Sequence, residues 1–327
     1  MLFQGYIYDI SQYIDFHPGG IDRLLPFLGK DIESVFKQVG HTSAAYRVMA
    51  QLPVVGQIQG AENIEQDKLS PKLREKYEFD TDKGLWWQMM WTEWTLKEYL
   101  DYLEEPKILL SPWRPVKLFD NWFLENFTQG PYWMTPVVTL PVAYYFMTFA
   151  QTNFQETILT FAAGFVFWTF FEHALHRFIF HGERYWVPDN QYAIACHFVM
   201  NGIHHAYPQD WRRTVFPWTL VFAILYPFMI VPMQKILPEY YADAFISGQI
   251  TGYCLFELMH YFTHYGQSKL TYLRRVTRQH MHHHYRGADV DFGVTTVFWD
   301  WLLDAYTPLE KDKRTSFFWE TISKKSD

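Results

Sequence analysis

Residues 160–181 read TFAAGFVFWTFFEHALHRFIFH, an apolar run that ends in two histidines, His176 and His181. The run belongs to an apolar segment at 156–180, close to the ~20 residues that a bilayer-spanning helix needs. Similar segments lie at 133–151, 216–236 and 241–262, and short connections join the segments into two hairpins. The sequence therefore predicts four transmembrane helices. The acidic Glu172 and Glu257 leave open the alternative of buried helix pairs in a soluble bundle.

Basic side chains are unevenly distributed around these segments. The hairpin tips, 151–155 and 236–240, contain no Lys or Arg, and Lys235 borders the second tip. The central loop and the C-terminal part carry most of the arginines of this region, namely Arg177, Arg184, Arg212, Arg213, Arg274, Arg275, Arg278 and Arg286. By the positive-inside rule, both termini and the central loop are predicted to be cytosolic.

The composition excludes several classes of protein. With 49% hydrophobic and 20% aromatic residues among 327, the chain is not a disordered one. The net charge of -7 gives no reason to expect a nucleic-acid partner. The only two cysteines, Cys196 and Cys254, exclude a disulfide scaffold and suggest a reducing compartment. The first residues lack the basic and apolar regions of a signal peptide.

Ten of the 14 histidines fall on the predicted cytosolic face. They are His176, His181, His197, His204, His205, His260, His264, His280, His283 and His284. Many are three or four residues apart, a spacing that places side chains on one face of a helix. The predicted stripe at 197, 201, 204 and 205 is one example. Such stripes around a common centre predict a pair of metal ions with imidazole ligands.

The ligand type narrows the candidate metals, because imidazole suits iron, zinc and copper, but it does not identify which of them binds. His173 and His282 share faces with the predicted ligands but are left outside the set. Glu172 and Glu257 lie near histidines, and two roles remain open for them. They either orient an imidazole from behind or pack at helix ends.

These residues resemble the membrane fatty acid hydroxylase and desaturase superfamily, and within it the fatty acid 2-hydroxylases. The motifs that carry the resemblance are 175–181 (LHRFIFH), 197–205 (HFVMNGIHH), 260–264 (HYFTH), 280–285 (HMHHHY), 291–296 (DFGVTT) and Trp299-Asp300. Asn201 departs from the pattern, because close relatives usually carry a histidine at this position. It is therefore left outside the predicted ligand set.

The N-terminal residues resemble cytochrome b5 at 8–10 (YDI), 17–20 (HPGG) and 39–43 (VGHTS). The resemblance implies that His17 and His41 are the axial ligands of a haem b. Two histidines from opposite sides leave no open iron position, so such a haem transfers electrons. The chain begins late in this pattern, without the first strand and the segment containing a tryptophan.

The resemblance extends over nearly the whole chain and implies its organisation. We expect a small α+β cytochrome b5-like domain at 1–60, a connector at 61–130, a mainly helical, four-span hydroxylase domain with a cytosolic histidine-rich cap at 131–310, and a cytosolic tail at 311–327. Lys324 and Lys325 resemble a dilysine signal for the endoplasmic reticulum membrane.

The implied reaction is O2-dependent hydroxylation at C2 of a long-chain fatty acyl group for sphingolipids, at two metal ions, with iron expected and zinc an alternative. Electrons would arrive from NAD(P)H through a cytochrome b5 reductase or similar donor and the haem. The substrate is a free fatty acid, an acyl-CoA or a ceramide, and the sequence does not distinguish these.

Three alternatives stay open. A front-end desaturase also fuses cytochrome b5 to histidine boxes, and its last box would start at Gln279, with His282 and His283 as ligands and His284 excluded. A sterol oxidase of the same superfamily is a lesser alternative, because a fused haem domain is not expected there. A haem-linked membrane protein with structural or stored metal would not be an oxygenase at all.

Overall fold

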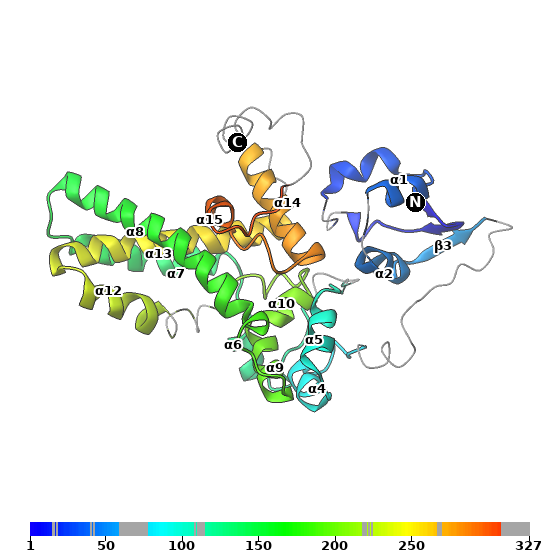
Figure 1. Cartoon of the computed structure of the whole chain (residues 1–327), viewed down its shortest axis with the longest axis horizontal. Helices are drawn as coiled ribbons and strands as arrows, with labels where there is room; N and C mark the ends of the chain where they lie inside the picture. The colour runs from blue at the N-terminus through cyan, green and yellow to red at the C-terminus, as the bar shows by residue number, and fades with distance from the viewer. Residues whose placement is uncertain are drawn as a thin grey trace.

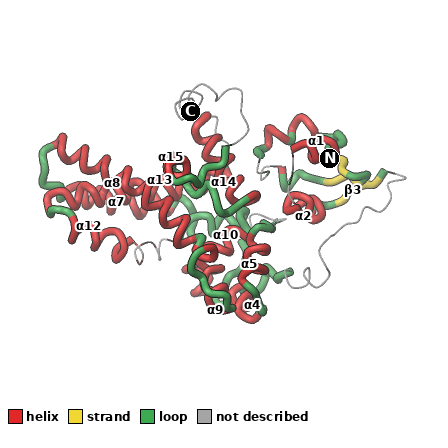
Figure 2. The backbone as a smooth tube through the Cα atoms, in the orientation of Figure 1, coloured by secondary structure: helices red, strands yellow, loops and turns green. Residues whose placement is uncertain are grey.

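The computed structural model describes residues 1–14, 17, 19–39, 41, 43–58, 78–107, 109, 115–217, 221, 223, 225–266 and 270–308. Within these residues the protein is mainly helical, and its strands are confined to the N-terminal unit (Figure 2). The predicted mainly α fold with a small N-terminal α+β unit is therefore confirmed. Residues 61–77 of the connector predicted at 61–130, and the tail with Lys324 and Lys325, lie outside the described residues.

The N-terminal unit is a three-stranded sheet with two helices. Strands β1 (Leu2–Phe3), β2 (Tyr6–Tyr8) and β3 (Val54–Gln57) pair antiparallel in the order β1-β2-β3. Gln4 and Gly5 turn the chain between β1 and β2 with positive φ angles of 50° and 79°. Helices α1 (Glu33–Val39) and α2 (Ser43–Gln51) contribute Phe36 and Met49 to the apolar core under the sheet.

A second group of short helices forms a separate apolar core. It contains α4 (Leu85–Trp91), α5 (Leu96–Leu103), α9 (Gln191–His197) and α10 (Ile203–Ala206). Thr95 and Glu98 begin α5 with a reciprocal capping box, which satisfies two backbone N–H groups that the helix leaves free. Helix α6 (Trp122–Phe127) follows on the connection to the long helices. Because α9 and α10 carry histidines, this core holds part of the site in place.

The helices of the apolar segments form two hairpins that pack together. Helices α7 (Met134–Thr148) and α8 (Phe154–Leu175) make the first, and α12 (Val231–Ile236) and α13 (Glu239–Tyr265) the second. Helix α13 packs against both α8 and α7. Gly164 and Gly248 permit the closest approach, because a Cβ at either position would lie 2.0 Å from a carbonyl oxygen of the facing helix.

Among the described residues, one continuous helical stretch, Phe154–Phe180, is long and apolar enough to cross a membrane. It comprises α8 and the π-helical turn His176–Phe180. Asn153 starts α8 by accepting a hydrogen bond from the Glu156 N–H at 3.0 Å. The apolar stretch thus leads directly into the first histidine motif.

Helix α14 (Thr271–Arg286) lies between the long helices and the N-terminal unit (Figure 1). The short helix α15 (Phe298–Leu302) lies beside α8. The loop between α14 and α15 contains Asp291, which has a φ of 61° and is fully buried. This loop passes next to the histidines.

Candidate metal centre

Nine histidines gather in two groups beside the ends of the long helices. The five-histidine group comprises His204, His260, His264, His280 and His284, and the four-histidine group comprises His176, His181, His205 and His283. Within each group the candidate ligand nitrogens all lie within 4.8 Å of one another. His204 and His205 are neighbours in α10 and join one group each. The structure therefore brings together nine of the ten histidines predicted as ligands.

Two π-helical turns explain how the local sequence aligns these rings. His176 and His181 are five residues apart, a spacing that would separate them by about 140° on an α-helix. The π-turn His176–Phe180 places them together, and the His181 N–H donates to the His176 carbonyl at 3.0 Å. A second π-turn, Phe198–Gly202, lies between α9 and α10. Turns of this kind occur often at functional sites.

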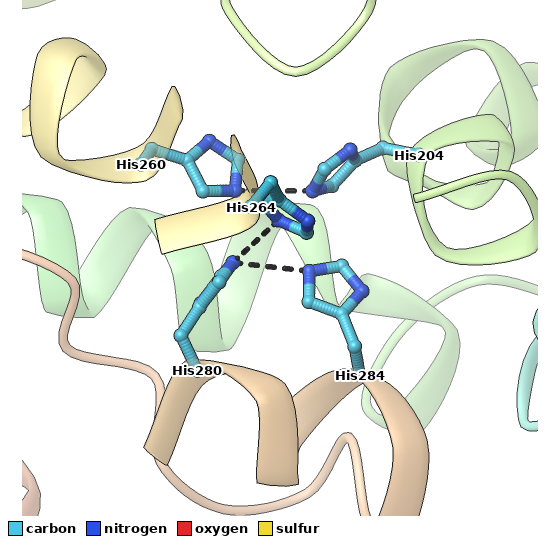
Figure 3. Close-up of side chains that lie close together, drawn as sticks. All are labelled: His204, His260, His264, His280 and His284. Carbon is cyan, nitrogen blue, oxygen red and sulfur yellow. Dashed lines mark hydrogen bonds between the residues drawn. The ribbon is translucent and has the colours of Figure 1, made fainter. Parts of the chain in front are cut away.

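The five-histidine group has its Nε2 atoms directed toward one centre (Figure 3). His204 and His260 Nε2 are 3.0 Å apart, His264 and His280 Nε2 are 2.9 Å apart, and His280 and His284 Nε2 are 3.1 Å apart. A metal ion bound about 2 Å from each nitrogen would separate its ligands by roughly 3 Å. The donor set fits a metal ion.

Outer acceptors orient the four-histidine group. His176 donates from Nδ1 to the Phe292 carbonyl at 2.6 Å, and His283 donates from Nδ1 to the Val290 carbonyl at 2.7 Å. His181 donates from Nδ1 to Glu183 Oε1 at 2.8 Å, and its Nε2 lies 2.9 Å from that of His283. With Nδ1 occupied as a donor, Nε2 is left as the metal-binding nitrogen, as is usual for metal-bound histidine.

Burial keeps the histidines of the two groups neutral. It lowers the pKa of His205, His280 and His283 well below the usual histidine value, and neighbouring imidazoles lower it further. A metal binds the neutral form of imidazole. The centre is thus held in its binding form without competition from protons at neutral pH.

The tenth predicted ligand, His197, lies outside both groups. Its Nε2 is 2.6 Å from Glu183 Oε2 and 2.7 Å from the Phe180 carbonyl oxygen, and the Tyr99 hydroxyl donates to its Nδ1 at 2.7 Å. The π-turn after His197 inserts about one residue relative to an α-helix, which rotates His197 away from His204 and His205 by about 100°. The predicted stripe does not form for this reason.

Sequence reasoning did not find Glu183 and Tyr99. Burial alone would raise the pKa of Glu183, but hydrogen bonds from His181 and His197 outweigh it and hold the pKa below its usual range. The carboxylate therefore stays ionised behind His181. A sequence signal existed for Glu183, which follows His181 by two residues, but none existed for Tyr99, which is 98 residues from His197.

His282 also lies outside both groups. Its Nδ1 is 2.9 Å from a carboxylate oxygen of the buried Asp291, and the Gln279 side-chain amide donates to the other oxygen at 3.3 Å. His280, His283 and His284 all belong to the groups. The last motif thus adopts the spacing that starts at His280 and not the desaturase spacing that starts at Gln279.

Two buried carboxylates fix the loop at 291–297. Glu172 accepts hydrogen bonds from Val294 N–H at 3.0 Å and from both the N–H and the hydroxyl of Thr295. Asp300 accepts from the Phe292 and Gly293 N–H groups, each at 2.8 Å. Because the same loop supplies the Phe292 carbonyl to His176, these carboxylates act on the metal group through the loop. Of the two roles left open for Glu172, the structure supports the orienting one.

A cavity of about 360 Å³ lies next to both groups. Apolar side chains such as Trp168, Leu225 and Phe256 line most of it, and His176, His204 and His260 reach its wall. Glu257 also lines the cavity and accepts a hydrogen bond from the Phe216 N–H at 3.0 Å. An apolar cavity with a few polar groups at one side suits an alkyl chain whose reacting carbon lies beside the metals.

The N-terminal unit holds its two predicted haem ligands facing each other. The ring centroids of His17 and His41 are 6.4 Å apart, which fits an iron bound about 2 Å from each nitrogen. His17 Nδ1 lies 3.3 Å from the Gly20 carbonyl oxygen and His41 Nδ1 lies 2.9 Å from that of Phe36, so both Nε2 atoms are free to bind iron. Burial lowers the pKa of His17 to about 4. The residues fit a bis-histidine haem.

Comparison with known proteins agrees with this arrangement. Residues 1–59 match the family described as cytochrome b5-like haem/steroid binding domain, and residues 161–305 match the family described as fatty acid hydroxylase. A solved structure of full-length scs7p, in which only the hydroxylase domain is visible, superimposes with a TM-score of 0.67 and 32% identity. That likeness covers 73% of this chain and 91% of the other.

Relatives are similar over most of their length. The ceramide very long chain fatty acid hydroxylase SCS7 of Saccharomyces cerevisiae is 30% identical over 94% of this chain and 91% of its own. The fatty acid 2-hydroxylase of Mus musculus is 30% identical, with 93% and 90% covered. The dihydroceramide fatty acyl 2-hydroxylase FAH2 of Arabidopsis thaliana is 32% identical, with 70% and 93% covered.

Fold and site together define a hydroxylating oxidoreductase in which a cytochrome b5-like haem domain is fused to a helical domain with a histidine-rich centre. Within that class, the chain belongs to the fatty acid 2-hydroxylase family.

Proposed function

We propose that this protein hydroxylates C2 of long-chain fatty acyl groups for 2-hydroxy sphingolipids, with a ceramide or its acyl precursor as substrate. The observation that carries the proposal is the apolar cavity whose wall includes His176 from one group and His204 and His260 from the other. The names of the yeast, mouse and plant relatives support the same reaction. The Gln279 spacing of a desaturase is not favoured, because His282 is paired with Asp291.

We assign the nine grouped histidines as ligands of a di-iron centre, and His197 as a residue that positions His181 through Glu183. Iron bound there supplies O2 activation and the removal of hydrogen from C2, and the protein supplies placement and a dry site. The cavity wall orients the acyl chain, and the buried helices exclude bulk water. Glu183 and the 291–297 loop keep the imidazoles of the four-histidine group in register.

The electrons are assigned to a haem b between His17 and His41, reduced by a NAD(P)H-dependent cytochrome b5 reductase or similar donor. Burial raises the pKa of Tyr13 in the N-terminal unit, and Tyr285 of α14 is close enough to raise it further. Burial is the main cause that lowers the pKa of His41, and the positive charge of Arg286, also in α14, lowers it as well. The haem side of the N-terminal unit therefore faces the end of the helix that carries His280, His283 and His284.

We assign the protein to the endoplasmic reticulum membrane as a four-span protein with cytosolic termini and a cytosolic metal centre. The apolar stretch Phe154–Phe180, the hairpin arrangement of α7, α8, α12 and α13, and the arginine distribution support this topology. The C-terminal Lys324 and Lys325 support the location.

Product analysis tests the reaction. Membranes containing the chain receive NADPH, O2, a reductase and isotopically labelled long-chain acyl substrates, and the lipids are hydrolysed for mass spectrometry. The proposal predicts a product heavier by one oxygen atom, with the hydroxyl at C2. A product lighter by two hydrogen atoms would identify a desaturase, and an oxidised sterol would identify a sterol oxidase. Metal-loaded protein that consumes no oxygen would support a structural or storage role for the metal.

A further inference from the structure

The two histidine groups are unequal, and an asparagine lies next to the smaller one. Asn201, in the π-turn before His205, is 6% exposed, and its Nδ2 lies 3.4 Å from His181 Nε2. Its side chain also lines the cavity. Four imidazoles and one carboxamide thus surround this position, whereas five imidazoles surround the other.

The hydrogen bonds of Asn201 show which end of its amide faces the group. Its Nδ2 donates to the Phe180 carbonyl at 3.1 Å, and the same oxygen lies 2.7 Å from His197 Nε2. Because Nδ2 is tied to an acceptor, it is the amide nitrogen that faces His181. An amide nitrogen donates hydrogen bonds and has no lone pair for a metal. Asn201 therefore offers a donor where the other group has a fifth ligand.

Metal binding to His181 would leave the Asn201 Nδ2 group without the nitrogen that it now faces, His181 Nε2. Once the lone pair of His181 Nε2 binds a metal, the second N–H of Asn201 Nδ2 has nothing to donate to at that atom. A buried donor without an acceptor is costly, so an acceptor is expected there. The cavity next to Asn201, His176 and His204 gives space for a small ligand.

We propose that Asn201 keeps a coordination position of the four-histidine group open and binds a small hydrogen-bond-accepting ligand there, such as water, hydroxide or azide, through its amide N–H. The inference rests on the metal pair of the proposed function. It makes the two metals chemically distinct, with the exchangeable position on the metal held by His176, His181, His205 and His283.

Azide binding to full-length protein loaded with cobalt(II) tests this inference, because cobalt absorption in the visible range reports changes in coordination. Wild type, Asn201→Leu and Asn201→His are titrated with azide after metal analysis. Asn126→Leu is the control, since the Asn126 amide donates to the Trp122 carbonyl on the exposed face of α6. No acyl substrate, O2 or reductase is present, so the outcome does not depend on hydroxylation.

Wild type and Asn126→Leu are expected to bind two cobalt ions and one azide. Asn201→Leu keeps the open position but loses the donor, so its azide affinity should fall about tenfold or more. Asn201→His supplies a fifth imidazole and should abolish azide binding with both metals retained. Unchanged azide affinity in either Asn201 variant would overturn the role of Asn201. Fewer than two cobalt ions in wild type would overturn the metal pair beneath it.

Discussion

At the scale of single residues, Glu183 connects the metal centre to the surrounding protein. It is buried, and its two oxygens contact His181 and His197. Glu183→Gln keeps the size but removes the charge behind His181, so metal affinity should fall about 10- to 100-fold. Metal content after dialysis against a graded chelator measures this.

The control for that substitution is Glu104→Gln. Glu104 pairs with Arg184 at 3.0 Å on the surface, where such pairs contribute little. Metal retention should not change in this variant. Equal retention in Glu183→Gln and wild type would show that Glu183 does not support the centre.

Two neighbouring histidines provide a sharper comparison. His283 belongs to the four-histidine group, whereas His282 pairs with Asp291. His283→Ala should abolish turnover and lower metal content while the haem spectrum survives. His282→Ala should retain both metals and lower only stability, by about 1–3 kcal/mol, because it leaves the buried Asp291 short of a partner. Loss of metal in His282→Ala would instead favour the desaturase spacing, in which His282 and His283 are both ligands.

At the scale of elements, the contact between α8 and α13 determines whether the two halves of the site meet. Gly248→Val places a side chain against the Phe161 carbonyl and should lower the free energy of unfolding by about 3 kcal/mol. Ala163→Val, on an exposed position of α8, is the matched control. Thermal unfolding in detergent compares them. Equal melting temperatures would contradict the close approach of these helices.

The π-turns mark the limit of what the sequence predicts. Spacings of three and four correctly grouped His260 with His264, and His280 with His284, because those pairs lie on regular helices. The same spacings did not place His197 with His204 and His205, because the π-turn at 198–202 rotates the residues before it relative to those after it. Tyr99 acts through its contact with His197, which is 98 residues away in the chain, and no local pattern encodes such a contact.

At the scale of the whole molecule, two metal-binding units with separate cores are joined in one chain. The apolar segments predicted a mainly helical protein, and the resemblance to cytochrome b5 implied a small α+β N-terminal unit, whereas the four-span topology and the domain boundaries stay predictions. The helices α7 and α12 are too short as described to pass the length required of a span.

The separate cores predict that the two centres can be lost independently. His41→Ala removes one axial ligand of the haem, so the absorbance typical of bis-histidine haem should disappear while two metals per chain remain. Turnover supported by NADPH and a reductase should be lost in the same variant. Metal analysis together with the absorption spectrum checks this. Loss of both centres in His41→Ala would contradict their independence.

Hydroxylation at the histidine centre is tested most directly by following the atoms of the reaction. Acyl substrate with two deuterium atoms at C2 is turned over under oxygen-18 gas by membranes containing the wild-type chain or His283→Ala. Wild type alone should form a 2-hydroxy product with one oxygen-18 atom and one remaining deuterium. A product that keeps both deuterium atoms, contains oxygen from water, or forms equally in His283→Ala would contradict hydroxylation at this histidine centre.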